Sequence, residues 1–246
     1  REKRMMAPDI SFAIPCHNEK DNLQALLAAV TSEADRLSLD YEIVITDDAS
    51  TDGSWDLLKS LVRDYPRLQA QRLESNSGQS AASFAAIKAS RGGIIVTLDA
   101  DLQNDPRDLP KFLQALATAD CVCGTRGASR AQSDSWTKNL ISRCSNWVRR
   151  RVLQDPITDA GCAYRAFRRE CMEGIPFFKG AHRFLPILLD LRGFRVVEVP
   201  VVNQARHSGK SHYGVFARFD AIVDMFAVRW MKSRMRGFKV AERVPD

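Results

Sequence analysis

The sequence predicts one α/β domain, with helices packed on a mostly parallel β-sheet. Short β-branched and apolar runs alternate with segments whose leucines and alanines recur at helical spacing. The chain has 246 residues, of which 45% are hydrophobic, enough to bury the core of one such domain. Because parallel sheets bind ligands at the carboxyl ends of their strands, polar residues that follow strands are the functional candidates.

The first half of the chain contains the clearest strand and helix signals. The expected strands are residues 9–15, 41–46, 67–73 and 94–98, and the expected helices are one capped by Asn18 and two at 55–65 and 79–90. The run 94–98 is apolar throughout, which is typical of a strand covered on both faces. The alternation predicts right-handed crossovers between parallel strands.

The pattern loosens after Cys121-Val122-Cys123, where we expect a helix over 136–152 and a final amphipathic helix over about 215–234. The last helix carries an apolar stripe at spacings of three and four, made of Phe216, Phe219, Ile222, Val223, Phe226 and Trp230. Such a stripe is typical of a helix packed on its own domain. The cations near its end also suit docking to an anionic bilayer surface.

The organisation expected along the chain is a disordered leader at 1–8, a catalytic α/β domain at 9–214, and the amphipathic helix with a basic tail at 215–246. Its most apolar stretch is interrupted by charged residues, so it does not predict a membrane-spanning helix. The six cysteines contain no CxxC pair, which favours reduced, buried thiols over a zinc site or disulfides.

A formal net charge of +6 favours anionic partners. Nucleic acid is disfavoured, because the cations are not interleaved with aromatic residues in a known binding motif. The sequence has neither a GxxxxGK nor a GxGxxG motif, so it supports neither P-loop nucleotide hydrolysis nor dinucleotide redox chemistry.

Three acidic clusters fall at the ends of expected strands. Asp99, Asp101 and Gln103 come directly after the most apolar strand, and their oxygens suit Mg²⁺ or Mn²⁺ with open positions for substrate phosphates. The plainer alternative for a single DxD is helix capping. The position of this DxD motif at the end of a buried strand favours the metal site.

Asp48 follows the strand at 41–46 and is a candidate to accept hydrogen bonds from a nucleotide base or ribose. The turn at 52–54 is assigned mainly to structure. Asn76 and Gly78 precede an alanine-rich helix, whose free N–H groups can bind phosphate or base oxygens.

These motifs together resemble family 2 glycosyltransferases of the dolichol-phosphate mannose synthase type. The resemblance rests on Ile14-Pro15 with Asn18-Glu19, on 47–54, 76–78, 99–106, 124–126 and 158–170, and on Arg206 to Gly214, and covers roughly 9–234. It implies a GT-A fold and a metal-dependent transferase.

The resemblance also implies roles for individual residues. The nucleotide pocket would comprise Pro15, Asn18, Glu19, Asp48, Asn76, Gly78 and Asp99, with the metal held by Asp99, Asp101 and Gln103. Arg126 and Arg206 would bind phosphates, joined by the loop residues Lys210, Ser211 and His212. Relatives commonly have Lys or Arg where this chain has His212, so either Lys210 or His212 could contact the diphosphate.

The expected reaction is inverting transfer of a sugar from GDP-mannose or a UDP-sugar to dolichyl or undecaprenyl phosphate. The catalytic residues would be Asp101, Arg126, Asp159 and Arg206. A phosphate acceptor is already anionic and needs no base, whereas a hydroxyl acceptor would need one, for which Asp159 is the candidate.

We expect a cytoplasmic protein, peripheral on the inner face of the membrane and held there by the last helix or by a membrane-protein partner. The alternatives are the same fold acting on a saccharide hydroxyl, and a non-catalytic nucleotide-binding module.

Overall fold

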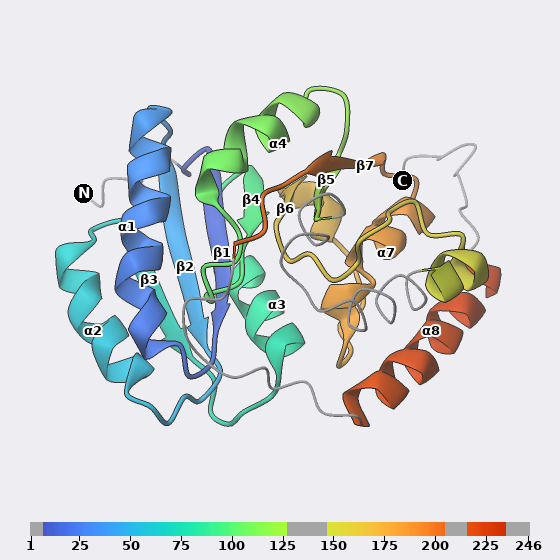
Figure 1. Ribbon diagram of the computed structural model, residues 1–246, viewed down its shortest axis with the longest axis horizontal. Helices are drawn as coiled ribbons and strands as arrows, with labels where there is room; N and C mark the ends of the chain where they lie inside the picture. The colour runs from blue at the N-terminus through green and yellow to red at the C-terminus, as the bar shows by residue number, and fades with distance from the viewer. Residues whose placement is uncertain (1–6, 127–146, 205–215, 235–246) are drawn as a thin grey trace, which may run out of the picture.

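The computed structural model describes residues 7–126, 147–204 and 216–234, with only the backbone for 216–221. A seven-stranded sheet runs through the molecule in the order β3-β2-β1-β4-β6-β5-β7 (Figure 1). Its strands are β1 (Ile10–Cys16), β2 (Tyr41–Asp47), β3 (Leu68–Arg72), β4 (Ile94–Thr97), β5 (Cys121–Thr125), β6 (Arg165–Arg168) and β7 (Val196–Pro200). Only β6 runs antiparallel to its neighbours within this sheet, which confirms the mostly parallel architecture.

Helices cover both faces of the sheet. They are α1 (Lys20–Arg36), α2 (Ser54–Asp64), α3 (Gln79–Ala89), α4 (Leu109–Ala115) and α7 (Leu185–Leu191), and a further helix, α8 (Phe216–Arg234), lies outside these two layers. One core joins α1, α2 and α4 to the sheet side that carries Phe12 and Ile14. A second core joins α3 and α7 to the side that carries Ala13 and Phe167. Successive residues of β1 therefore serve opposite cores, as the strand period of two requires.

The expected strands and the first three helices all form, with ends that differ by a few residues. The expected helix at 136–152 is described only from residue 147, and residues 147–153 are helical. The five described cysteines are free and buried, as expected: Cys16, Cys121, Cys123, Cys162 and Cys171.

The prediction that Asn18 caps the first helix is wrong. The N-cap position belongs to Glu19, and no side chain there makes a capping hydrogen bond. Asn18 has a φ of 55°, and its Oδ1 accepts a hydrogen bond from the Thr51 N–H at 2.8 Å. The start of α1 is instead satisfied by the next loop, where Asp52 Oδ2 accepts from the Lys20 N–H at 3.1 Å. Capping preference is local, and here a long-range contact overrides it.

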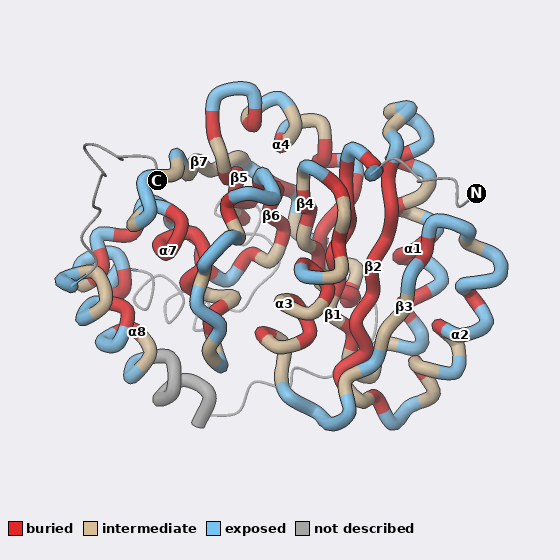
Figure 2. Tube along the Cα trace, turned by 180° about the vertical axis from the view of Figure 1, so that it is seen from behind, coloured by how far each residue is buried: buried red, intermediate tan, exposed pale blue. Residues whose placement is uncertain are grey.

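Helix α8 packs with a different face from the one its apolar stripe predicts. Met225 and Val228 are buried against a core of Leu153, Phe184, Ile187 and Leu188. The four stripe residues whose side chains are described are 50–68% exposed: Ile222, Val223, Phe226 and Trp230. The expectation that this stripe packs on its own domain is therefore wrong for these four residues. Figures 1 and 2 place α8 at the end of the molecule away from α1 and α2. No described helix is long and apolar enough to cross a membrane.

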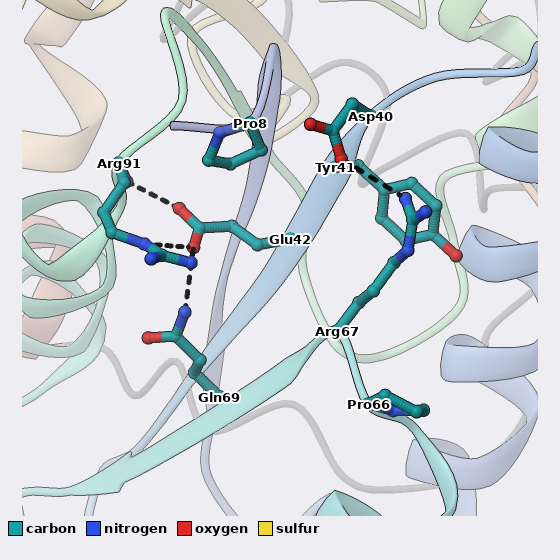
Figure 3. A pocket seen from close by; sticks show the side chains of 8 residues that line it. All are labelled: Pro8, Asp40, Tyr41, Glu42, Pro66, Arg67, Gln69 and Arg91. Carbon is teal, nitrogen blue, oxygen red and sulfur yellow. Dashed lines mark hydrogen bonds and ion pairs between the residues drawn. The ribbon is translucent and has the colours of Figure 1, made fainter. Parts of the chain in front are cut away.

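A buried carboxylate, Glu42, joins three strands and a turn at the amino ends of the sheet. It accepts a hydrogen bond from Ser11 Oγ at 2.7 Å. It also accepts from Arg91 N and Nε at 2.6 and 2.9 Å and from Gln69 Nε2 at 2.8 Å (Figure 3). Burial raises the pKa of Glu42, but the hydrogen bonds from Ser11 and Arg91 outweigh it and lower the pKa overall. The ionised form is thus favoured in the folded protein.

Replacing Glu42 by Gln should destabilise the fold at pH 7 by about 1–3 kcal/mol, because an amide cannot accept from all of these donors. The folded pKa is lowered, so the stabilisation is present above the unfolded pKa of about 4.3 and is lost as the pH falls through the folded value. Urea denaturation at pH 7 and between pH 3 and 4.5 measures this, with the exposed Glu74→Gln as control. A wild-type advantage that stays constant with pH would contradict the assignment.

Candidate functional site

The loops that follow β1, β2 and β4 meet at the carboxyl edge of the sheet, beside the start of α3. Asp48 follows β2 directly and is 3% exposed. Its Oδ1 accepts from the Ser77 N–H at 2.7 Å and its Oδ2 from the Gly78 N–H at 2.8 Å. Gly78 has a φ of 88°, which residues with side chains rarely adopt. Asp48 therefore holds the 76–78 loop against the end of β2 and shapes the pocket predicted for the nucleotide.

His17 belongs to the same cluster and was not among the site residues predicted from the sequence. Its Nδ1 lies 2.8 Å from the Asp48 carbonyl oxygen, so Nδ1 is assigned the proton. Its Nε2 then accepts from the Asn76 or Asn18 side-chain amide, each 3.1 Å away. The signal available in the sequence was its place between Pro15 and Asn18, two residues predicted to line the pocket.

The end of β1 contributes Pro15, and the loop that follows it contributes Asn18 and Glu19. Pro15 lies in β1 opposite Thr46 of β2. The Asn18 N–H donates to Ser50 Oγ at 2.9 Å, and the Glu19 N–H to Ser54 Oγ at 3.1 Å. The loops after β1 and β2 are thus joined into one half-buried surface.

The predicted metal ligands lie at the end of β4. Asp99 Oδ1 accepts from Gln79 Nε2 at 2.8 Å, and Asp101 Oδ1 accepts from the Gln103 N–H at 3.1 Å. Burial and the charge of Asp101 raise the pKa of Asp99 to about 6. A divalent cation would remove this repulsion, so the two carboxylates fit such an ion.

Among the described residues, no three His, Cys, Asp or Glu side chains form a metal-binding group. An ion held by Asp99 and Asp101 would therefore take further ligands from Gln103, substrate phosphates and water, as Mg²⁺ and Mn²⁺ commonly do.

The loop that carries the predicted metal ligands, residues 99–103, is fixed to the segment after β7. The Gln204 N–H donates to the Gln103 carbonyl oxygen at 2.9 Å, and Gln204 Nε2 donates to Asp105 Oδ2 at 3.0 Å. Gln204 is two positions before Arg206. Arg206, Lys210, Ser211 and His212 themselves lie outside the described residues.

Arg126 and Asp159, which the sequence suggested separately, form a buried ion pair. Arg126 Nε donates to Asp159 Oδ2 at 2.8 Å and a terminal nitrogen donates to Oδ1 at 3.0 Å. Burial opposes the charge of Arg126, but the hydrogen bonds and attraction of Asp159 outweigh it and raise the pKa of the guanidinium. Asp159 therefore holds Arg126 in a fixed, charged orientation.

Glu198 of β7 supports this pair and was not singled out in the sequence. Its Oε1 accepts from the Thr158 N–H at 2.8 Å and from the Asp159 N–H at 3.1 Å. It lies 39 positions from Asp159, and no local pattern links the two residues.

The hollow in Figure 3 lies at the opposite, amino edge of the sheet. Its charged groups pair with one another: Glu42 with Arg91 at 2.8 Å, and Arg67 with Asp40 at 3.7 Å. These pairs account for its charges structurally, and none of the predicted site residues lines it.

Comparison with known proteins identifies the family. The family model "Glycosyl transferase family 2" matches residues 11–175, and the chain belongs to this family. A protein of Aeromonas hydrophila subsp. hydrophila, "Undecaprenyl-phosphate 4-deoxy-4-formamido-L-arabinose transferase", is 33% identical over 217 residues, which are 88% of this chain and 66% of that protein. A protein of the same name from Sodalis glossinidius is 31% identical over 222 residues, 90% of this chain and 68% of that protein. The chain thus spans about two thirds of the length of these relatives.

Solved structures show the same fold. A mannosyltransferase from Pyrobaculum calidifontis in complex with GDP-Man and Mn²⁺ has a TM-score of 0.64 and 21% identity, over 95% of this chain and 66% of that one. Glucosyl-3-phosphoglycerate synthase from Mycobacterium tuberculosis, in complex with Mn²⁺, UDP and glucosyl-3-phosphoglycerate, has a TM-score of 0.64 and 17% identity. The match covers 94% of this chain and 81% of that one. The predicted GT-A fold is confirmed.

Mn²⁺ affinity should fall as the pH is lowered through about 6, because the ion then competes with a proton on Asp99. Well below that pH the affinity should drop about tenfold per unit. Titration of the protein with Mn²⁺ alone, followed by electron paramagnetic resonance at pH 7.5 and 5, measures this. Asp101→Asn is the control that locates the ion in this loop. Equal affinity at both pH values would contradict the assignment of Asp99 as a ligand.

Proposed function

We propose that this chain transfers a sugar, with inversion, from a nucleotide-diphosphate sugar to a polyprenyl phosphate. The observation that carries the proposal is the buried guanidinium of Arg126, held by Asp159 on the same sheet edge as Asp99 and Asp101. Arg126 and Asp99 are near enough for the charge of each to shift the pKa of the other. This arrangement fits two anionic substrates that meet beside a cation.

The donor is proposed to be GDP-mannose or a UDP-sugar. The two similar structures hold GDP-Man and UDP with Mn²⁺, which supports a nucleotide and a divalent ion, Mg²⁺ or Mn²⁺. The proposed nucleotide pocket is formed by Pro15, Asn18, Glu19, Asp48, Asn76, Gly78 and Asp99. His17 joins it, because it contacts both Asp48 and Asn76.

The acceptor is proposed to be dolichyl or undecaprenyl phosphate. The names of the relatives refer to undecaprenyl phosphate, which supports this class. The loop with Arg206, Lys210, Ser211 and His212 is proposed to bind phosphates. These four residues lie outside the described ones, and Gln204, two positions before Arg206, is hydrogen bonded to Gln103.

The proposed mechanism assigns each residue one task. When bound, the divalent ion would neutralise charge on the departing diphosphate. Arg126 offsets the repulsion between the acceptor phosphate and the donor, and Asp159 fixes the orientation of Arg126. The acceptor phosphate is already ionised, so no residue has to remove a proton from it.

A saccharide acceptor is the alternative within the same fold, and a silent nucleotide-binding module is the alternative outside catalysis. A hydroxyl acceptor would need a base, and both oxygens of Asp159 are already bonded to Arg126. This favours the phosphate acceptor. A silent nucleotide-binding module would use the metal and nucleotide residues, but it would not need a buried arginine for a second anionic substrate.

Replacing Arg126 by Ala should lower kcat for a polyprenyl phosphate by about a hundredfold or more, because a positioned cation is lost where charge gathers. Nucleotide affinity should stay within a few-fold, since Arg126 acts when the acceptor is also bound. Radiolabelled sugar transfer into a butanol-extractable lipid measures the first effect, and nucleotide titration measures the second.

Arg67→Ala is the control for Arg126, because Arg67 lies at the amino edge of the sheet and pairs with Asp40. A parallel assay offers mono- and disaccharides to the wild type. Product found only with saccharides would disprove the lipid acceptor, and no product with any donor and acceptor pair would favour the non-catalytic alternative.

We also propose that α8 lies on the cytoplasmic face of a membrane, as part of a surface formed by 215–246. Ile222, Val223, Phe226 and Trp230 are exposed, and the exposed Arg229 and Arg234 are on the same helix. Apolar side chains next to cations match the boundary between acyl chains and anionic headgroups. The site would then face its lipid substrate from a peripheral position.

The double change Phe226→Ser and Trp230→Ser should weaken binding to vesicles containing phosphatidylglycerol by at least tenfold, because each large side chain contributes about 1.5–3 kcal/mol when buried. Co-sedimentation at low and high salt measures this, with Val62→Ser on α2 as the control. Unchanged binding of the double variant would contradict the role of α8. No binding of the wild type to bare vesicles would instead favour a membrane-protein partner.

A further inference from the structure

Arg165 is a buried arginine that the mechanism above does not use. It begins β6, opposite Thr97 of β4 and Cys123 of β5, and is 4% exposed. Within the described residues it forms no ion pair, and its Nε is buried without a hydrogen-bond partner. Asp99 and Asp155 are near enough for the charge of Arg165 to act on the pKa of each carboxyl, but neither forms an ion pair with it. Burying an arginine without a directly bonded carboxylate is costly, so packing alone does not explain the choice of residue.

The two terminal nitrogens of Arg165 hold two separate segments of the chain. One donates to the carbonyl oxygen of His182, and the other donates to the carbonyl oxygen of Ala160 at 3.0 Å. A guanidinium is planar, so these two directions are fixed relative to each other. The two segments are thereby held at a set separation across the end of β6.

Through Ala160, Arg165 is connected to Asp159 and Arg126, the residues proposed to act on the acceptor. Ala160 directly follows Asp159, whose carboxylate holds Arg126 through two hydrogen bonds. The segment is held from its other end by Glu198, through the N–H groups of Thr158 and Asp159. Arg165 and Glu198 together therefore fix the position from which Asp159 orients Arg126.

Through His182, Arg165 is connected to the start of α3 and to Asp99, which is proposed to act on the donor. His182 Nδ1 is hydrogen bonded to Ser80 Oγ, which also accepts from the Gly180 N–H at 3.0 Å. Burial lowers the pKa of His182 to about 3, so its ring is neutral and accepts the Ser80 hydroxyl proton. Ser80 is the second residue of α3 and follows Gln79, whose amide donates to Asp99 at 2.8 Å.

We propose that Arg165 is a positioning residue that couples the acceptor arm, Asp159 and Arg126, to the donor arm, Ser80, Gln79 and Asp99. It fixes the spacing between the guanidinium that meets the acceptor and the carboxylate that meets the donor. The inference rests on the proposed function for the identity of the two substrates. The contacts themselves do not depend on it.

The spacing matters because displacement requires the acceptor oxygen in line with the bond that breaks. An error of about 1 Å in such an arrangement can cost a hundredfold in rate. A lysine at position 165 keeps the charge but, as a single point, cannot bond both carbonyl oxygens in the directions that the guanidinium does. Arg165→Lys therefore tests the loss of the two carbonyl contacts while the positive charge at this position is kept.

The experiment compares Arg165→Lys and Arg165→Met with Arg168→Met. Arg168 is on the same strand, and it donates to the Leu116 carbonyl oxygen at 3.0 Å, away from both arms. For each protein, thermal denaturation checks folding, and hydrogen–deuterium exchange follows peptides that cover 157–162 and 178–183. Mn²⁺-dependent nucleotide affinity, donor KM and kcat are then measured.

Both Arg165 variants should exchange faster in both segments, lower kcat at least tenfold and raise donor KM several-fold. Arg168→Met should change none of these beyond twofold. On an Arg126→Ala background, Arg165→Lys should lower kcat little further, because the acceptor arm has already lost its cation, while the rise in donor KM should persist.

Folded Arg165→Lys with kcat, donor KM and exchange within twofold of wild type would overturn the proposal. The proposal would also be overturned if Arg165→Lys lowered kcat by the same factor on the Arg126→Ala background as in the wild type. That result would show that Arg165 does not act through Arg126. If Arg165→Met does not fold, Arg165→Lys decides. If the wild type makes no lipid product, the proposed acceptor fails, whereas exchange and nucleotide affinity still test the coupling.

Discussion

The site depends on carboxylates that bind loop N–H groups at the carboxyl edge of the sheet. Loops that leave parallel strands carry backbone donors that no neighbouring strand can accept. Asp48 accepts from the N–H groups of Ser77 and Gly78, and Asp52 accepts from those of Lys20 and Ser54. Each acid joins segments that are distant in the sequence or caps a turn. These carboxylates therefore order the loops at this edge of the sheet.

The antiparallel strand β6 divides this edge into two parts. It lies between β4, which leads to Asp99, and β5, which leads to Arg126. Without β6, the loop with Asp99 and the loop with Arg126 would follow adjacent strands, whose backbones would lie about 5 Å apart. The inserted strand separates the two loops and brings Arg165 to the position from which it contacts both the 160 and the 182 segments.

The sequence predicted the features that depend on local patterns. The β-branched run of β2 and the apolar run of β4 are unambiguous, and the carboxyl-edge rule located Asp48, Asp99 and Asp101. The features it missed depend on contacts between distant residues. Asn18 resembles a helix cap but bonds to Thr51, and Arg126 and Asp159 pair across 33 positions. The stripe of α8 has the period of a packed face, yet Met225 and Val228 make the packing contacts instead. Periodicity identifies a helix with an apolar face but does not say which neighbour covers that face.

The pairing of Asp159 also bears on the choice of acceptor. A hydroxyl acceptor must lose a proton, and a carboxylate near the reacting carbon would have to take it. Four described acids at this edge already have other tasks: Asp159 bonds to Arg126, Asp48 bonds to the 76–78 loop, and Asp99 and Asp101 suit a metal ion. Asp52 and Glu198 likewise accept hydrogen bonds from backbone N–H groups. Protonating Asp159 would weaken the interaction that orients Arg126 and leave a buried cation without its counter-charge. A phosphate acceptor imposes no such cost, because it arrives ionised and uses the same arginine as a partner. The ion pair thus favours an anionic acceptor on electrostatic grounds, independently of any relative's name.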